Sequence, residues 1–495
     1  MMIANLSLFR RTLGNAAASF ALAAGLAGCS VGPDYTAPKT ALAPFHNLDA
    51  VTERKIATPA PALDRWWTGF NDPMLVTVVQ RALDQNLDLA ASLARVQQAR
   101  AAASAAGAQL LPTVDLDASA SAERQSIEGP LGAIGKSLPG YNRYQREYTV
   151  GPVASWEIDL FGGLRRDADA AGDEAEAAEA EQAGTRISVA ADAADAYLQI
   201  RGFQARLAVA RDQIDTDAHL LSLVDARHRA GQADLREYAQ AEALLRQAKA
   251  SIPPLSIGLE AQLNRLDVLM GVQPGTYARA LGEAADIPAI PAIGGDQPLD
   301  VLRRRPDIIA AERRLAASNE RIGAAISDYY PKISLSGALG FDSLSLNHLF
   351  SGKAFQPAGT GALSWRLFDF GKVDAEVASA RGSNAEALAQ YRQSVLKAVE
   401  DVEDALNSLS ETEAHVEALQ GEVESLTRSR DLSQKAYQAG TITLTDVLDA
   451  DRQLLTARDD LDGNRADAAR AAVHTFRALG GGWDASSGTQ VAEGH

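Results

Sequence analysis

One nine-residue phrase occurs twice in this chain. Residues 155–163 read SWEIDLFGG and residues 364–372 read SWRLFDFGK, so Ser, Trp, Phe and Gly recur in step. Trp156 and Trp365 lie 209 positions apart (365 − 156 = 209). Repetition at a fixed spacing indicates a duplicated structural unit. This duplication limits the possible folds more than any other feature of the sequence.

A second motif keeps the same register. Ala-Gly ends at Gly231 and at Gly440, 75 residues after each tryptophan (231 − 156 = 75; 440 − 365 = 75), and a leucine follows at Leu235 and Leu444. Each Ala-Gly separates two charged, Ala-rich segments. The repeated unit is therefore interpreted as strand, long helix, turn and helix.

The segments before the Ala-Gly motifs predict two unusually long helices. Residues 164–229 and 373–438 contain no proline, and at about 1.5 Å per residue each helix approaches roughly 100 Å. Return helices are predicted over 233–250 and 442–479. Pro253-Pro254 should break the first return helix, with a further piece over 255–270. Such helices need antiparallel neighbours, as in coiled coils, and a soluble coiled-coil rod is one alternative.

Between the helical parts the hydrophobic period changes from 3.6 to 2. Four runs alternate apolar and polar residues, at 113–121, 147–158, 332–342 and 361–367. Their length suits tilted strands that cross a bilayer, although two hairpins on a soluble sheet would give the same pattern. Four strands are too few to close a membrane barrel, for which about 8 is the lower limit. Chains would have to pool their strands, and the residues alone do not choose between two copies and three.

The N-terminus resembles a bacterial lipoprotein leader. Residues 1–28 have two arginines followed by a small-residue apolar run, as in a secretory signal peptide. The run ends Leu-Ala-Gly-Cys at Cys29, the single cysteine, which excludes an intramolecular disulfide. We expect Cys29 to be acylated and to anchor the chain in a membrane; Ser30 after it favours delivery to the outer membrane. The alternative is that Cys29 is an unmodified small residue in an apolar segment.

These features divide the chain. An N-cap at Asp72 with Pro73 starts a helix near Met74, and another helix is predicted over 88–109. About ten extra residues in the first repeat fall between 122 and 146, where glycines and prolines predict a flexible loop. The predicted divisions are a signal peptide (1–28), a tether (29–64), a first repeat (65–273) with hairpin 113–158 and tunnel helices 164–270, a linker (274–300), a second repeat (301–483) with hairpin 332–367 and tunnel helices 373–479, and a disordered tail (484–495).

Composition and motifs argue against catalysis and nucleic-acid binding. A net charge of −17 disfavours contact with phosphates. The P-loop-like GPLGAIGKS at 129–137 has Pro130 where the first glycine is required. Asp369-Phe370-Gly371 spells a kinase triplet without the catalytic loop. The seven histidines are scattered, so we predict no enzyme, no metal site and no cofactor.

One charged constellation follows the second Ala-Gly motif. Asp446, Asp449 and Arg452 are spaced at i, i+3 and i+6, with Asp451 beside them. On a single helix they would form a solvated face with weak local ion pairs. If several chains met on an axis, the same side chains would form a charged constriction.

The whole pattern resembles the outer membrane factors of bacterial tripartite efflux systems, the TolC-like channels, and within them the lipoprotein, NodT-type branch that works with RND pumps. The resemblance covers residues 20–483 in order. It rests on LAGC at 26–29, VGPDY at 31–35, Trp66-Trp67 with Phe70 and Asp72-Pro73, LRRRPDI at 302–308, both Trp…Phe-Gly turns, both Ala-Gly turns, DVLDADR at 446–452 and LGGGW at 479–483.

The resemblance implies a mixed α/β membrane protein. Each chain of a homotrimer would contribute four strands to a 12-stranded outer membrane β-barrel, and the long antiparallel helices would form a periplasmic α-helical tunnel. The implied partners are a periplasmic adaptor (membrane fusion) protein, an inner-membrane RND pump and outer membrane lipid, with no nucleic acid. The implied function is a passive conduit for export of drugs or other small molecules. Type I protein secretion and a lipid-anchored coiled-coil scaffold are the alternatives.

The resemblance also implies roles for particular residues. The predicted sites are the lipidated Cys29; a periplasmic gate of Asp446, Asp449 and Arg452; adaptor-contact tips at Gly231, Gln232, Leu235, Gly440, Thr441 and Leu444; and strand-to-helix turns at Trp156, Phe161, Gly162, Trp365, Phe370 and Gly371. The first repeat has Gln240 and Ala243 at the positions of Asp449 and Arg452. A charged ring would therefore come from the second repeat alone.

Overall fold

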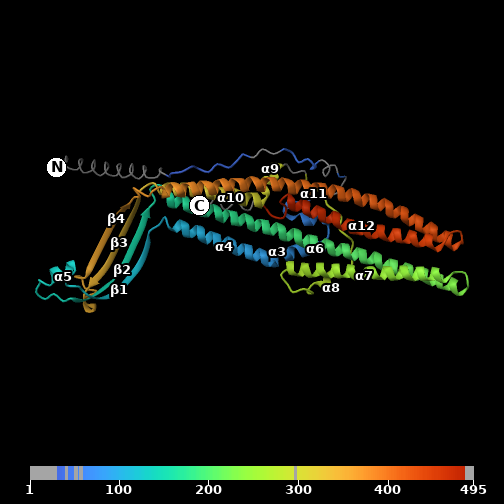
Figure 1. The fold of residues 1–495 in the computed structure, drawn as a ribbon, viewed down its shortest axis with the longest axis horizontal. Coiled ribbons are helices and arrows are strands. Elements are labelled where there is room, and N and C mark those ends of the chain that lie inside the picture. Colours follow the sequence, from blue (N-terminus) through green and yellow to red (C-terminus); the bar gives the residue numbers. More distant parts are fainter. Residues whose placement is uncertain (1–29, 40–42, 49–53, 55–59, 295–297, 485–495) are drawn as a thin grey trace, which may run out of the picture. The chain divides into compact units, whose positions relative to one another are not determined.

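The computed structural model describes residues 30–39, 43–48, 54, 60–294 and 298–484 (Figure 1). The predicted signal peptide, the predicted lipidation site Cys29 and the predicted tail beyond residue 484 lie outside these residues. The chain divides into two compact units. Unit 1 contains Met1–Pro38, Gln97–Glu176 and Glu312–Ala389, and unit 2 contains Lys39–Val96, Ala177–Ala311 and Gln390–His495.

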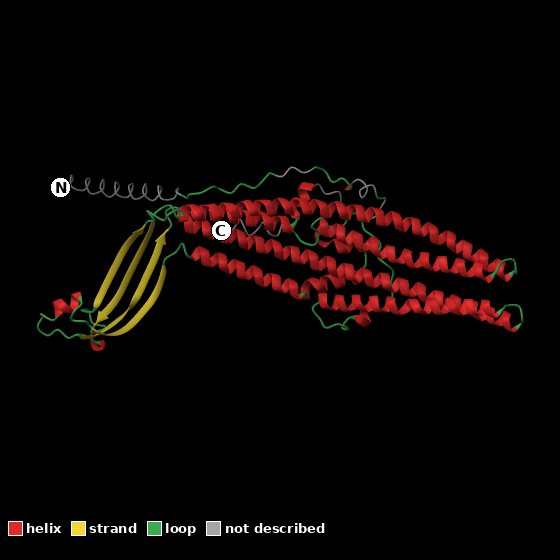
Figure 2. Ribbon diagram, viewed as in Figure 1, coloured by secondary structure: helices red, strands yellow, loops and turns green. Residues whose placement is uncertain are grey.

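Unit 1 contains a four-stranded antiparallel sheet in the order β1-β2-β3-β4 (Figure 2). The strands are β1 (Thr113–Arg124), β2 (Tyr144–Ile158), β3 (Lys332–Ser343) and β4 (Phe355–Ser364). The four predicted runs thus form four paired strands. The two loops that join β1 to β2 and β3 to β4 carry short helical turns, α5 (Pro130–Gly135) and η2 (Leu346–His348).

The two faces of this sheet differ in chemistry. On one face, hydroxyl groups pair between strands, as between Ser119 Oγ and Thr149 Oγ1 at 2.7 Å. In the register of the strands, the large apolar side chains that are exposed on the sheet all fall on the other face: Val114, Leu116, Tyr144, Trp156, Leu335, Leu339, Phe355 and Leu363. An apolar face of this extent, exposed on a single chain, marks a surface that contacts lipid or protein.

Two local predictions in unit 1 were wrong. The fourth strand ends at Ser364 and not at Leu367, and it begins earlier, at Phe355. Its partner strand explains the end: β3 begins at Lys332, which pairs with Ser364, directly after Pro331, which has no amide proton to extend the ladder. The flexible loop predicted between 122 and 146 is shorter than that range, which contains the end of β1, the start of β2 and the helical turn α5.

The long helices confirm the duplication in detail. The helices α6 (Gly163–Arg229) and α11 (Lys372–Gln438) both have 67 residues, and α7 (Leu235–Leu269) and α12 (Leu444–Ala478) both have 35. Two shorter helices, α4 (Leu87–Ala108) and α10 (Pro306–Ser327), both have 22 residues. None of the helices within the described ranges has a stretch long and apolar enough to pass through a membrane.

Unit 2 has an aromatic core. Trp66 and Trp67 of η1 (Leu63–Phe70) are buried, and Trp66 stacks on Phe476 of α12 with ring centroids 5.3 Å apart. The helix α3 (Pro73–Gln85) begins as predicted, because Asp72 Oδ1 accepts hydrogen bonds from Met74 N (2.8 Å) and Leu75 N. The predicted linker contains α8 (Ala278–Leu281) and the start of α9 (Pro298–Arg304).

The predicted break at Pro253-Pro254 is also wrong, because α7 continues through both prolines. Two proline rings remove two amide donors and normally kink or end a helix. Here Ile252, Leu255 and Leu259 pack against Leu207 and Ala210 of α6 on either side of the prolines. This packing holds both halves of α7 along the same neighbour and offsets the missing hydrogen bonds.

Candidate functional site

Both helical hairpins of unit 2 reverse direction at the Ala-Gly motifs (Figure 1). Gly231 and Gly440 have φ values of +68° and +77°, a left-handed conformation that side chains with a Cβ rarely adopt. In the first turn Gln232 N donates to Arg227 O (2.8 Å), and in the second Thr441 N makes the equivalent bond (2.9 Å). These bonds end the helices in the Schellman manner. Both predicted tips are therefore tight turns.

The two leucines after these turns have opposite environments. Leu235 is 68% exposed, whereas Leu444 is 1% exposed. Leu444 belongs to an apolar cluster between the two hairpins, the tip cluster, made by Leu220, Val224, Ala241, Leu244, Tyr437, Leu444, Val447 and Leu448. Equivalent positions of the repeat thus have different roles, and Leu444 is not available for contact with another protein in this conformation.

The three predicted gate residues are also unlike one another. Asp446 Oδ2 accepts hydrogen bonds from Thr443 N (2.9 Å) and Thr443 Oγ1 (2.7 Å), a capping box that begins α12. These hydrogen bonds lower the pKa of Asp446. Asp449 and Arg452 form an ion pair at 3.6 Å, and both side chains are more than half exposed. Asp446 is exposed as well, but its Oδ2 is engaged in the helix cap, whereas Asp449 and Arg452 pair with each other on the helix surface.

The first repeat offers no charge at the matching positions. Gln240 is partly buried and Ala243 is exposed. The side-chain oxygen of Gln240 has no hydrogen-bond partner among the residues that the structure describes. The asymmetry seen in the sequence is thus present in the fold.

The strand-to-helix turns of unit 1 are tied by the two repeated tryptophans. Trp156 Nε1 donates to Leu110 O (2.9 Å), and Trp365 Nε1 donates to Tyr329 O (3.0 Å). The glycines that follow, Gly162 and Gly371, have φ values of +78° and +85°. The turns differ in their aromatic rings: Phe161 stacks on Tyr330 with centroids 4.5 Å apart, whereas Phe370 has φ +55° and a fully exposed ring.

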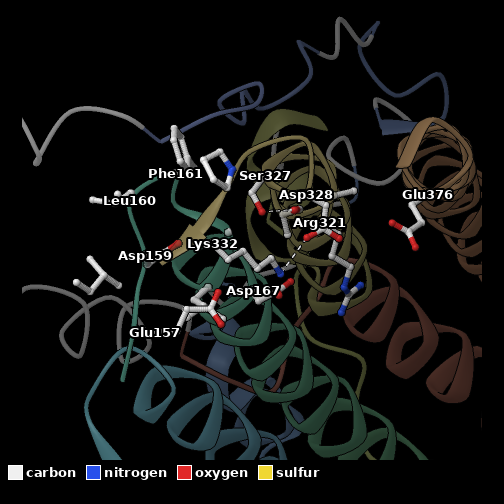
Figure 3. A pocket seen from close by; sticks show the side chains of 16 residues that line it. Glu157, Asp159, Leu160, Phe161, Asp167, Arg321, Ser327, Asp328, Lys332 and Glu376 are labelled. Atoms are coloured by element: carbon white, nitrogen blue, oxygen red, sulfur yellow. Dashed lines mark hydrogen bonds and ion pairs between the residues drawn. The ribbon is translucent and has the colours of Figure 1, made fainter. Parts of the chain in front are cut away.

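A cavity of about 300 Å³ lies beside the first turn (Figure 3). Both of its basic side chains have ion-pair partners: Lys332 Nζ lies 2.9 Å from Asp328 Oδ1 in the lining, and Arg321 pairs with Glu174 outside it. Burial raises the pKa of Asp167, which Arg321 and Lys332 partly oppose. In the described part of the chain no three His, Cys, Asp or Glu side chains are arranged to hold a metal ion. Ion pairs thus form part of the cavity wall.

Residues 30–38, here called the strap, lie against the same turn. Val31 N donates to Phe161 O (3.1 Å). Gly32 has φ +103°, and a Cβ there would lie 2.5 Å from Gly323 Cα. The Arg166 guanidinium donates to Glu320 (2.5 Å) and to Asp34 (3.0 Å).

The roles of the strap's partners were missed in the sequence. Arg166 and Gly323 are single residues within helices, and nothing in the sequence around them indicates contact with residues 30–38. Among the strap residues themselves, the VGPDY motif was noted, but only as part of the resemblance.

Comparisons with known proteins agree with this architecture. The family model described as "Outer membrane efflux protein" matches residues 78–272 and 298–481. The chain is 33% identical over 424 residues to the pyoverdine export outer membrane protein OpmQ of Pseudomonas aeruginosa, covering 86% of this chain and 88% of that protein. It is 30% identical over 441 residues to nodulation protein T of Rhizobium leguminosarum bv. trifolii, covering 88% and 91%.

Solved structures give the same result. The outer-membrane channel OprN superposes with a TM-score of 0.83 at 32% identity, covering 92% of this chain and 100% of that one. The open state of the MtrE outer membrane channel of Neisseria gonorrhoeae superposes with a TM-score of 0.78 at 27% identity, covering 92% and 99%. A four-stranded sheet joined to long antiparallel helices is thus common to this chain and to outer membrane channels.

Proposed function

Because this chain belongs to the outer membrane efflux protein family, we propose that three copies of it form the channel of a tripartite efflux system driven by an RND pump. The observation that carries the proposal is the two-faced sheet. Its apolar face suits lipid, and its hydroxyl-rich face suits a water-filled lumen.

The edges of the sheet supply the argument for assembly. β1 and β4 are the outer strands of the sheet within the chain. An unpaired strand edge in lipid leaves backbone donors and acceptors unsatisfied, at several kcal/mol each. Pairing β4 of one copy with β1 of the next removes both edges, and three copies close a barrel of about 12 strands, above the minimum of about 8. A closed assembly is thus the state in which this sheet is stable in a membrane, and the trimer is the closed form that the resemblance to outer membrane factors implies.

The tips are proposed to bind a periplasmic adaptor. Gly231, Gln232, Gly440 and Thr441 are exposed, and Leu235 adds an exposed apolar side chain. A tight turn with exposed backbone and one apolar anchor suits docking of another protein. Leu444 leaves the set of direct contacts because it is buried.

Asp449 and Arg452 are proposed to close the periplasmic end. An exposed pair on one chain contributes little. Three such pairs brought around an axis would alternate in sign and attract one another between protomers. Asp446, which caps α12, acts on this gate by fixing the start of that helix.

We propose that Cys29 carries lipid. The strap holds Ser30 against Gly162, where a Cβ would lie 2.6 Å from Ser30 Oγ, so an acylated neighbour would reach the membrane beside the first strand-to-helix turn. Cys29→Ser should lose the mass of the acyl groups in intact-protein mass spectrometry. The substrates are proposed to be small molecules. Toluene, solvents and pyoverdine appear in the names of relatives but are not assigned to this chain.

The decisive experiment combines assembly and conductance. The full-length chain, extracted from outer membranes, should migrate as a heat-modifiable trimer and insert into planar bilayers as a channel. It should also restore drug tolerance to a host that lacks its own outer membrane efflux channel, together with an adaptor and an RND pump. A chain that conducts but works only with an ABC exporter would favour type I secretion. A chain without conductance would point to the scaffold and overturn the proposal.

A further inference from the structure

Two aspartates occupy core positions between the helical hairpins. Asp217 of α6 is 1% exposed and Asp451 of α12 is 3% exposed. On α6 the buried positions recur every three or four residues, at Leu207, Ala210, Gln213, Asp217, Leu220 and Val224. On α12 the buried face includes Leu444, Leu448, Asp451, Leu454 and Ala457, also three or four residues apart. This spacing is that of a helix face packed on a neighbour, so each carboxylate stands where an apolar side chain is the rule.

Each of the two carboxylates has few polar contacts. Asp217 Oδ1 accepts from Gln213 Nε2 (2.8 Å), while its Oδ2 has no hydrogen-bond partner within the described ranges. Asp451 Oδ1 lies 3.2 Å from Arg430 Nε of α11, an ion pair without the alignment of a hydrogen bond. Arg430 thus pairs with Asp451, and its charge also acts on Asp217.

The other elements around Asp217 do not add positive charge. On α11, Asp431 increases the negative charge near Asp451. On α7, the buried side chain between Leu244 and Leu255 is Ala248, which is uncharged. The interface of α6 and α12 around Asp217 and Asp451, here called the seam, thus holds more negative than positive charge.

The electrostatics favour a neutral carboxyl. Burial raises the pKa of Asp217 to about 6, with Gln213 and Arg430 opposing the shift and Asp451 adding to it. Burial also raises the pKa of Asp451, against Arg430. A carboxyl whose pKa is raised in the packed state binds its proton more tightly there than in water. Acid therefore favours the packed seam, and the advantage is lost as the pH rises from about 4 through about 6.

We propose that Asp217 and Asp451 form a proton-sensitive latch between the two helical hairpins of one protomer. With one carboxyl neutral, the seam packs continuously with the tip cluster, because Leu220 and Leu448 lie one turn away on the same faces. With both carboxylates charged, their repulsion in a dry seam exceeds what the single Arg430 offsets, and α6 separates from α12.

The latch lies beside the proposed gate at the periplasmic end. Asp451 is adjacent to Arg452 and two residues from Asp449 on the same helix, yet it faces the seam while they face outward. Displacement of α12 from α6 therefore displaces the exposed ion pair. This consequence rests on the proposed gate, whereas the latch itself is a property of one protomer.

The test measures the seam directly. Spin labels at the exposed positions Ala218 and Gln453 report the α6–α12 separation in the full-length protein by pulsed electron–electron double resonance. Chains that carry only one of the two labels give the distances between subunits, which are then subtracted. At about pH 5 a narrow distribution is expected, and at about pH 8 a longer or broader one. Asp217→Asn, which keeps the shape of a neutral carboxyl, should retain the narrow distribution at both values.

Controls separate the latch from general charge effects. Asp215→Asn removes the same charge from an exposed position on the same helix and should leave the wild-type pH dependence intact. Asp451→Asn provides a second variant if Asp217→Asn fails to fold. A wild-type separation that is unchanged between the two pH values, or a pH response that survives in both Asn variants, overturns the latch. Channel conductance is recorded in parallel: its absence would overturn the proposed function and leave the distance result standing.

Discussion

The indole nitrogen of Trp156 donates a hydrogen bond to the carbonyl oxygen of Leu110, 2.9 Å away. Trp365 makes the same bond to Tyr329. Leu110 and Tyr329 each lie just after the helix that precedes a β-hairpin, so each indole ties the last strand residues of a hairpin to the point where the chain enters it. The repeated phrase found in the sequence therefore marks one closure for each hairpin.

Loss of these closures should loosen the hairpin ends. Trp156→Phe or Trp365→Phe removes the donor and retains most of the ring, and each is expected to cost about 1 kcal/mol. Hydrogen exchange of amides in 153–158 or 361–364 should accelerate in the respective variant. Trp483→Phe removes a comparable bond to Arg304 O in unit 2 and should leave these amides unchanged. Equal exchange in all three variants would refute a local role of the indoles.

The exposed pair Asp449–Arg452 should matter for opening and not for folding. In one chain an ion pair at 3.6 Å between half-exposed side chains contributes at most about 1 kcal/mol. Asp449→Ala with Arg452→Ala should therefore leave thermal stability nearly unchanged and raise single-channel conductance. Asp462→Ala with Arg465→Ala removes another i,i+3 pair of the same helix and should leave conductance at its wild-type value. Unchanged conductance in the first variant would count against the gate.

The two tip leucines should give opposite phenotypes. Leu444→Ala removes a fully buried side chain from the tip cluster and should lower the free energy of unfolding by about 2–5 kcal/mol. Leu235→Ala removes an exposed one and should change it by less than about 0.5 kcal/mol, while weakening copurification of the adaptor. Denaturant titration and pull-down separate the two effects. Weak adaptor binding with Leu444→Ala alone would reverse the assignment.

A fall in pH should reduce the stability that Asp195 contributes, whereas it favours the packed state around Asp217. Burial would raise the pKa of Asp195, but hydrogen bonds from His474 and Arg470 outweigh it and lower the pKa to about 2. A lowered pKa contributes stability that is present above about 4 and is lost as the pH falls through about 2. With Arg470→Met the protein should lose about 2 kcal/mol near neutral pH, and the difference from wild type should shrink near pH 3. Unfolding titrations at both pH values test this, and a constant difference would contradict it.

The bounds of α6 and α11 were predicted within one residue at the N-terminal ends and to the residue at the C-terminal ends, because these boundaries are local. Gly231 and Gly440 take left-handed conformations that end a helix whatever surrounds them. The end of β4 was not local, because it depends on where β3 begins after Pro331. Passage of α7 through Pro253-Pro254 depends on packing against α6.

The candidate sites divide in the same way. The positions of the tips follow from the Ala-Gly motifs, and the pairing of Asp449 with Arg452 follows from their i,i+3 spacing on a helix. The burial of Leu444 does not, since Leu235 has the same place in the repeat and is exposed. Asp217 was missed because one aspartate in an acidic helix normally faces water. Only its three- and four-residue spacing to buried neighbours distinguishes it.

The buried guanidinium of Arg166 should hold the strap in place. Arg166 and Glu320 pair at 2.5 Å with side chains 8% and 11% exposed. Arg166→Met leaves Glu320 buried without its partner, and removal of one member of such a pair costs about 3–5 kcal/mol. The free energy of unfolding should therefore fall by that amount, and protease should cut the strap near Asp34 faster than in wild type.

A second substitution separates the two consequences of that change. Arg166→Met with Glu320→Leu replaces the buried pair by apolar groups and should recover most of the lost stability. The strap should remain sensitive to protease, because Asp34 has still lost its guanidinium partner. Gly32→Ala should displace the strap without changing Arg166, because the added Cβ would meet Gly323 Cα. If the double variant regained both stability and protease resistance, Arg166 would stabilise unit 1 without holding the strap.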